Sequence, residues 1–282
     1  MQLGLLLFIS ILPVVLLGKF IYNHDKNKES KSLLTRLFIS GILSIALTLI
    51  LTGISEAIFP LLGEDPEKLN KIDLIANVFL GVAFIEEFSK WIMVKINAYN
   101  HKDFDEVYDA IVYTVFVSLG FACLENILYV VSGGLVTGIF RALLAVPGHA
   151  CDGVIMGYYI GLAKAAQIKG EKSKESKYLF LSILCPTLAH GFYDYCLMTE
   201  DILFILLFFI FVIILFIKCF ITVKKIAKSN RNMVTNQPAE YIQPTVNQPN
   251  NQPTITVERK FCPNCGAKVE TVYCPHCGTK NK

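Results

Sequence analysis

Charged residues are scarce in this sequence. Only 17% of its 282 residues are Asp, Glu, Lys or Arg, against about 25% in an average soluble domain. The deficit falls in long apolar blocks, which excludes an ordinary soluble domain and predicts an integral membrane protein with a small polar end. The formal net charge is only +3, so bulk charge gives no reason to expect nucleic-acid binding.

The N-terminus also lacks the features of a cleaved signal peptide. No basic residue precedes the first apolar block, the block is long, and no small-x-small cleavage site follows it. These absences favour a first membrane span over a signal peptide.

Seven apolar blocks are each long enough to cross the hydrocarbon core, which takes about 20 helical residues. The blocks are Leu3–Tyr22, Leu37–Leu62, Leu74–Ile96, Val107–Val131, Gly138–Ala163, Tyr178–Met198 and Ile202–Val223. We therefore predict an all-α polytopic membrane protein with about seven transmembrane helices, spanning residues 1–228.

The connections between these blocks alternate in charge. The first, third and fifth connections and the segment after the last block are basic, whereas the second and sixth are acidic and the fourth carries no Lys or Arg. The basic residues are Lys19, Lys26, Lys28, Lys31 and Arg36; Lys95 and Lys102; Lys164, Lys169, Lys172, Lys174 and Lys177; and Lys218, Lys224, Lys225, Lys228 and Arg231. Because basic loops stay in the cytoplasm, we predict a multi-pass cell-membrane protein with its N-terminus outside and its tail cytoplasmic.

The tail has two parts. Residues 229–258 are rich in Asn, Gln, Pro and Thr and have few large apolar side chains, which predicts a disordered linker. Residues 259–282 contain two C-x-x-C pairs, formed by Cys262, Cys265, Cys274 and Cys277. Four thiolates at this spacing suit a tetrahedral structural zinc ion, and the Gly after each pair permits the tight turn.

The alternative for these cysteines is two disulfides, which a reducing cytoplasm disfavours. The segment resembles the small zinc-ribbon modules at the ends of many bacterial membrane proteins, and we expect one short β-hairpin that folds around its metal. Its mild basic charge and few aromatic residues favour a cytosolic protein partner over nucleic acid.

Ionisable side chains interrupt four of the predicted spans. They are Glu86, Glu87 and Lys90; Glu125; Arg141, His149 and Asp152; and His190 and Asp194. Each formal charge at the centre of a membrane costs about 2.5–3.5 kcal/mol by insertion scales, and the total is on the order of 20 kcal/mol if all were central and unpaired. These groups must therefore face one another or face water.

Helical spacing and depth support their convergence. Glu86 and Lys90 are four residues apart, as are His190 and Asp194, so each pair shares a helix face. Counting from the predicted outer boundary places the acids and imidazoles at a similar level, in the outer half of the membrane. Pro147-Gly148 would open the fifth span beside His149, which suits a water-lined cavity.

Two chemical readings of this cluster remain open. A carboxylate in a low-dielectric cavity can act as a general base on water, with a histidine or a protonated acid stabilising the oxyanion. Alternatively, glutamates and histidines can hold a catalytic zinc with an open water position. Both lead to amide hydrolysis, although the sequence has no H-E-x-x-H, G-x-G-D or G-x-S-G motif.

Non-enzymatic readings exist too. Single polar residues in spans often serve as interhelical glue, which we favour for Asn126, Tyr129, Tyr158 and Tyr193. Buried Glu/His chains also occur in proton-coupled transporters, and a membrane scaffold could present the zinc ribbon. No evident inverted repeat is present, which counts against a transporter.

Four motifs in order resemble those of the PrsW family of intramembrane proteases, part of a wider group that includes CAAX prenyl endopeptidase-like glutamate proteases. They are EEFSK (Glu86–Lys90), FACLEN (Phe121–Asn126), FRALLAVPGH (Phe140–His149) and HGFYD (His190–Asp194). The resemblance covers Leu3 to Val223. It implies an endopeptidase that cuts membrane-anchored substrates of the anti-sigma-factor type on their outer side.

The resemblance assigns catalytic positions to Glu86, Glu87, Glu125, His149 and His190. In our hypothesis Glu86 or Glu87 activates water and Glu125 shares or tunes that proton, while the histidines polarise the scissile carbonyl or bind a metal. Four further residues support them: Asp194 orients a histidine, Lys90 and Arg141 balance charge, and Asp152 lies beside His149.

Overall fold

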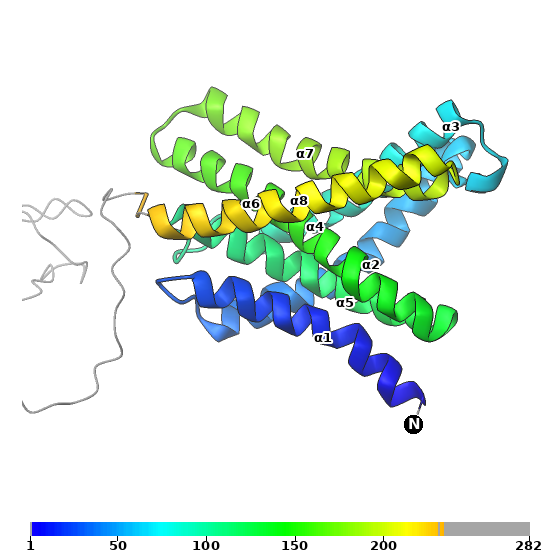
Figure 1. Ribbon diagram of the computed structural model, residues 1–282. Coiled ribbons are helices and arrows are strands. Elements are labelled where there is room, and N and C mark those ends of the chain that lie inside the picture. The colour runs from blue at the N-terminus through cyan, green and yellow to red at the C-terminus, as the bar shows by residue number, and fades with distance from the viewer. Residues whose placement is uncertain (1, 231, 234–282) are drawn as a thin grey trace, which may run out of the picture. The chain divides into compact units, whose positions relative to one another are not determined.

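The computed structural model describes residues 2–230 and 232–233, and these residues are almost entirely helical (Figure 1). The helices are α1 (Gln2–His24), α2 (Lys31–Ile58), the 3₁₀ turns η1 (Pro60–Gly63) and η2 (Pro66–Lys68), α3 (Lys71–Ala76), η3 (Asn77–Ala83), α4 (Phe84–Asn97), α5 (Val107–Phe140), η4 (Arg141–Ala145), α6 (Val146–Ile168), α7 (Lys172–Met198) and α8 (Ile202–Ser229). The predicted all-α class is confirmed for this part of the chain.

The predicted zinc ribbon and nearly all of the predicted linker lie outside the described residues. The structure therefore gives no geometry for Cys262, Cys265, Cys274 or Cys277. The start of the predicted linker is described, however, and it contacts the bundle. Asn230 is only 4% exposed, and its side chain accepts a hydrogen bond from the backbone N–H of Tyr108 at 3.2 Å.

Helix α5 is the centre of the bundle. It packs against α1, α2, α4, α6 and α8, and nearly every residue from Tyr108 to Cys123 is buried. Such all-round burial explains why this segment is apolar on every face rather than amphipathic.

The apolar run Val107–Ile168 folds back on itself at Gly134. Gly134 has φ +75° and ψ −161°, a conformation essentially reserved for glycine. Beyond it the chain runs antiparallel to the first arm, with the backbone of Val115 against Gly153 and that of Val107 against Gly161. The missing Cβ atoms let the two backbones approach closely, and this hairpin sets Glu125 and His149 on facing helices.

Four helical runs are long and apolar enough to cross a membrane: Gly4–His24, Lys31–Ile58, Val107–Ile168 and Ile202–Ser229. The run from Lys71 to Asn97 and helix α7 fall outside this group. Each carries ionisable residues of the predicted site in its apolar stretch: Glu86, Glu87 and Lys90 in the first, and His190 and Asp194 in α7. These residues lower the hydropathy of the two segments. The chain is a membrane protein with several apolar helices.

The basic connections meet at one end of the bundle. Lys26 of the α1–α2 connection donates to the backbone carbonyl of Lys228 at the end of α8, 3.3 Å away. Arg36 donates to the carbonyl of Asn97, and Tyr99 donates to Glu175 at the start of α7. At the other end Lys71 pairs with Asp201 at 2.8 Å.

Two helices widen to π-helical geometry near the site. Segment η3 directly precedes the turn that carries Glu86 and Glu87, and η4 directly precedes the turn that carries His149. Leu143, four residues before Pro147, lies inside η4. Because Pro147 has no N–H to bond to Leu143, the helix opens one turn earlier than the Pro-Gly pair itself.

The prediction of interhelical glue is confirmed for Asn126 but not for Tyr129 and Tyr158, whose side chains are 51% and 37% exposed. Asn126 acts as interhelical glue, since its side-chain amide donates to the carbonyl of Ser10 on α1 at 3.1 Å. The single cysteines in the spans, Cys123, Cys151, Cys185, Cys196 and Cys219, are free thiols, and all but Cys185 are buried.

Candidate active site

The ionisable residues of four helices converge inside the bundle, as the sequence predicted. Glu86, Glu87 and Lys90 come from α4, Glu125 from α5, His149 and Asp152 from α6, and His190 and Asp194 from α7, while Arg141 reaches in from η4. Direct contacts link all nine side chains into one network.

Lys90 lies at the centre of this network. Its Nζ is 2.7 Å from Glu87 Oε1 and 3.5 Å from Glu86 Oε2, and its side chain is completely buried. The same Nζ is 3.2 Å from His149 Nδ1 and lies over the ring of Phe121, 4.1 Å from its centroid. The lysine ammonium thus compensates part of the negative charge that Glu86 and Glu87 bring into the bundle.

His149 is held between a cation and a carboxylate. Because an ammonium group has only donors, Lys90 donates to Nδ1, and the Nε2–H of His149 donates to Glu125 Oε2 at 2.8 Å. The same oxygen of Glu125 is 2.7 Å from Arg141 Nη2. Asn126 fixes Arg141 in turn by accepting from its Nε at 3.1 Å.

His190 is surrounded by four carboxylates, since its Nε2 also lies 3.9 Å from Glu86 Oε2. Its Nδ1 is 3.0 Å from Glu87 Oε1 and 4.0 Å from Asp152 Oδ2, while its Nε2 is 3.2 Å from Asp194 Oδ2. The two imidazole rings meet edge to face, with centroids 5.2 Å apart. Each histidine therefore turns Nε2 to an outer carboxylate, Glu125 or Asp194, and Nδ1 to the inside of the cluster.

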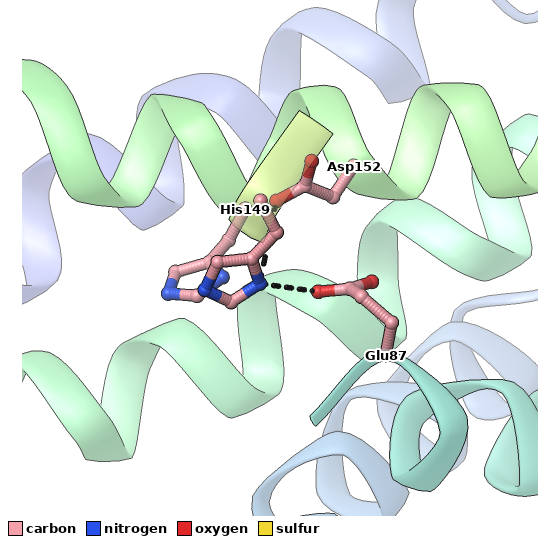
Figure 2. Close-up of side chains that lie close together, drawn as sticks. Glu87, His149 and Asp152 are labelled. Carbon is pink, nitrogen blue, oxygen red and sulfur yellow. Dashed lines mark hydrogen bonds and ion pairs between the residues drawn. The ribbon is translucent and has the colours of Figure 1, made fainter. Parts of the chain in front are cut away.

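The inside of the cluster has the donor set of a transition-metal site. Ligand atoms of Glu87, His149, Asp152 and His190 all lie within 4.8 Å of one another, and all four residues are buried. Figure 2 shows Glu87, His149 and Asp152 turned toward one another. Glu87 Oε2 is a buried oxygen without a hydrogen-bond partner in the described structure.

Two features of these residues suit a metal ion, but His149 Nδ1 can ligate it only after Lys90, which donates to that nitrogen at 3.2 Å, has moved away. Imidazole and carboxylate together are the ligands of catalytic zinc. Metal-binding histidines usually donate their second ring N–H to a carboxylate, and Glu125 and Asp194 occupy that position here.

A cavity of about 500 Å³ opens beside the cluster. Its polar wall includes Glu86, Glu125, Arg141, His149, Asp152, His190 and Asp194. Its apolar wall includes Phe140, Leu144, Ile205, Phe208 and Phe209. Glu87 is not part of the wall and is completely buried behind it, so Glu86 is the member of the glutamate pair that a cavity water can reach.

Comparison with known proteins identifies the family. The model of the "PrsW family intramembrane metalloprotease" matches residues 29–219, which contain every residue of the membrane cluster. The chain belongs to the PrsW family. The membrane cluster is therefore the candidate active site of a membrane protease.

Several curated relatives carry the name Protease PrsW. The one from Geobacillus kaustophilus is 39% identical over 188 residues, covering 67% of this chain and 77% of that protein. The one from Oceanobacillus iheyensis is 35% identical over 226 residues, covering 80% and 96% respectively. The Bacillus subtilis protein is 49% identical over 119 residues, covering 42% and 53%. No solved structure matches the chain.

The structure also adds residues to the site. Asp152 enters the metal-like donor set, whereas the sequence predicted only a supporting position for it beside His149. Its spacing of three residues from His149, on the same helix face, was the available signal. Phe121 and Tyr129 cover Lys90 and Arg141 with their rings, and only their position next to charged motif residues marks them in the sequence.

Proposed function

We propose that this PrsW-family protease cuts a peptide bond of membrane-anchored protein substrates, with Glu86 as the group that activates water. The observation that carries the proposal is the position of Glu86. Its carboxylate lines the cavity, whereas Glu87 is buried behind it and bonded to Lys90 and His190. A general base must reach the water from which it takes a proton.

The buried set Glu87, His149, Asp152 and His190 would hold the metal of this metalloprotease family. When bound, a metal ion supplies Lewis-acid polarisation of a carbonyl and of water. Glu125 and Asp194 orient the two imidazoles through their Nε2 atoms. Arg141 neutralises Glu125 and so keeps that carboxylate from competing for the water proton.

Lys90 has a different task in this proposal. It has no place in the cavity wall and contacts Glu86, Glu87 and His149 from behind. Its charge offsets part of the negative charge that Glu86 and Glu87 bring into the bundle.

The lining of the cavity suits a piece of extended polypeptide. It combines polar side chains with apolar side chains of α7 and α8, so a substrate segment can place its carbonyl near Glu86 and its side chains against apolar residues. The family resemblance suggests an anti-sigma factor as the type of substrate.

The proposed membrane arrangement has seven spans, an outer N-terminus and a cytoplasmic tail. Two points support this arrangement. The basic connections lie at one end of the bundle, and the positive-inside rule places basic connections in the cytoplasm. The fold-back at Gly134 divides Val107–Ile168 into two antiparallel arms. The cytoplasmic tail would present a zinc ribbon to a protein partner.

The test is a cleavage assay in native membranes with Glu86→Gln and Glu87→Gln, separately and together. We expect each single variant to lose about 10²–10⁴-fold in rate, because Glu86 supplies the base and Glu87 holds the cluster. Glu56→Gln is the matched control, since Glu56 is exposed near the end of α2. Undiminished cleavage by the double variant would exclude the proposal.

The same membranes address the alternative of a proton-coupled transporter. The comparisons do not favour that alternative, because the relatives are named as proteases. The transporter alternative would be favoured if the protein showed no proteolytic activity but carried out proton-coupled uptake that Glu86→Gln abolishes.

A further inference from the structure

A second cluster of buried carboxylates lies away from the active-site cavity, at the end of the bundle where the basic connections meet. Asp25 follows α1, and Glu106 and Asp109 begin α5. The three residues are only 2%, 1% and 1% exposed. One oxygen of each lies within 4.8 Å of the others. None of the three lines the cavity described above.

The hydrogen bonds of this cluster are unevenly distributed. Glu106 accepts from the side-chain amides of Asn27 and Asn230, one on each oxygen. Asp109 Oδ2 accepts from the backbone N–H groups of Asp105 and Glu106, at 3.1 and 2.8 Å. In contrast, neither carboxylate oxygen of Asp25 accepts a hydrogen bond of good geometry in the described part of the chain, although the backbone N–H groups of Asn27 and Glu29 lie near enough to lower its pKa. A buried carboxylate without a good hydrogen bond is costly, so it requires an explanation.

The nearby lysines do not form ion pairs that would explain the buried carboxylate of Asp25. Lys28 uses its Nζ on the backbone carbonyl of Tyr22, and Lys26 uses its Nζ on that of Lys228. Within residues 2–230 and 232–233, no Lys or Arg forms an ion pair with Asp25, Glu106 or Asp109. The three carboxyl groups therefore lack a direct ion pair among the described side chains, although the charge of Lys28 lies near enough to lower the pKa of Asp25.

A bound proton is the simplest competing explanation. Burial raises the pKa of Asp25 to about 6. Burial also raises the pKa of Glu106, so a proton held by the cluster and a bound cation are alternatives that the experiment below separates.

We propose that Asp25, Glu106 and Asp109 together bind one hard divalent cation, Mg²⁺ or Ca²⁺. The donor atoms are all carboxylate oxygens, which these ions prefer, and no imidazole or thiol is present to favour zinc or copper. Carboxylate oxygens accept more than one partner, so Glu106 and Asp109 keep capacity for a cation beside their present bonds.

The cation would have a structural effect. It would join the α1–α2 connection to the start of α5. Through Asn230, which bonds to Glu106, it would also fix the end of α8. The site is independent of the proposed protease mechanism, so either can fail without the other.

The experiment measures thermal unfolding of the full chain, purified in detergent at pH 7.5 and freed of Mg²⁺ and Ca²⁺. MgCl₂, CaCl₂ and NaCl of matched ionic strength are added in separate arms. We expect Mg²⁺ or Ca²⁺, and not NaCl, to raise the Tm by about 5–10 °C at a concentration of about 100 times Kd. The arm with the larger shift identifies the ion.

Four variants test the assignment. Asp25→Asn and Asp109→Asn should each lose the shift. Asp103→Asn should keep it, because Asp103 is a half-exposed acid of the same connection that pairs with His101. Asp152→Asn should also keep it, because Asp152 belongs to the membrane cluster.

Two results would overturn the proposal. One is a shift that survives Asp25→Asn. The other is a wild-type chain with neither a shift nor one equivalent of Mg²⁺ or Ca²⁺ after gel filtration. If Asp25→Asn does not fold, Asp109→Asn and the metal content of the wild-type chain decide the question.

Discussion

Lys90 Nζ lies 2.7 Å from Glu87 Oε1, and both side chains are completely shielded from solvent. The pair joins two neighbouring turns of α4 and also contacts both histidines, because Lys90 reaches His149 and Glu87 reaches His190. A buried ion pair of this kind adds little net stability by itself, but removal of one partner leaves an uncompensated charge.

Lys90→Met should therefore destabilise the protein by about 3–5 kcal/mol. The free energy of unfolding, measured in mixed micelles with SDS, checks this value. The matched control is Lys95→Met on the same helix. Lys95 lies over the ring of Tyr99, and loss of such a cation–π contact costs about 0.5–1 kcal/mol at a partly exposed site.

The double variant Lys90→Met/Glu87→Gln distinguishes charge from packing. It removes both partners, so it should regain part of the stability that Lys90→Met loses. A double variant less stable than the single one would show that the lysine acts through its packing against Phe121 rather than through its charge.

Glu125→Gln and Asp194→Asn should weaken metal binding in the membrane cluster about 10–100-fold each. Both carboxylates contact the Nε2 atoms of the histidines, and loss of such outer partners has effects of this size. Metal affinity is measured in a chain whose four tail cysteines are replaced by serine, so that only the membrane cluster contributes.

Glu56→Gln in the same background should leave the metal affinity unchanged. Equal affinity in all three variants would mean that the imidazoles bind metal without these carboxylates, or that the metal lies elsewhere.

The sequence predicted the convergence of the site but not its individual contacts. The cost of burying charges requires that they meet, and helix periodicity places His149 and Asp152 on one face. The spacing of four residues paired Lys90 with Glu86, whereas the structure gives Lys90 a shorter contact with Glu87, three residues away. Glu87 also contacts His190, which lies 103 residues further along the chain, and this contact helps to hold Glu87 close to Lys90. Local spacing cannot predict such tertiary contacts.

For the fold too, the sequence predicts the helices but not how they are connected. Apolar blocks predict the helices, and glycine-rich SGGLVTG predicts a connection. The structure reduces that connection to a turn at Gly134 between two helical arms. The buried acid cluster at Asp25 was not predicted, because Asp25 and Glu106 belong to charged connections that look solvent-exposed in the sequence and Asp109 lies near the end of a predicted span.

Gly134→Ala should destabilise the bundle by about 1–3 kcal/mol. No atom lies within 4 Å of the position that a Cβ would occupy, so the cost comes from the backbone conformation alone, a φ of 75° with a ψ of −161°. Gly53→Ala is the control: its Cβ also meets no neighbour, but Gly53 lies inside α2, where Ala is preferred by about 0.5–1 kcal/mol. Thermal unfolding compares the two. Equal Tm changes would show that the fold-back does not depend on the glycine conformation.

Deletion of residues 234–282 should leave peptide cleavage in membranes intact. Every residue of the active-site cluster and of the cavity wall lies between Val82 and Leu215, and the family model ends at residue 219.

Cys262→Ser/Cys265→Ser should release one equivalent of zinc from the full chain and leave the cleavage rate unchanged, because a ribbon that has lost two thiolates cannot hold its ion. Metal analysis and the rate of cleavage of one reporter substrate check both outcomes. If the deletion abolishes cleavage while the helical bundle keeps its Tm, the tail is part of the active enzyme, and the separation of a catalytic membrane domain from a recruiting tail would be wrong.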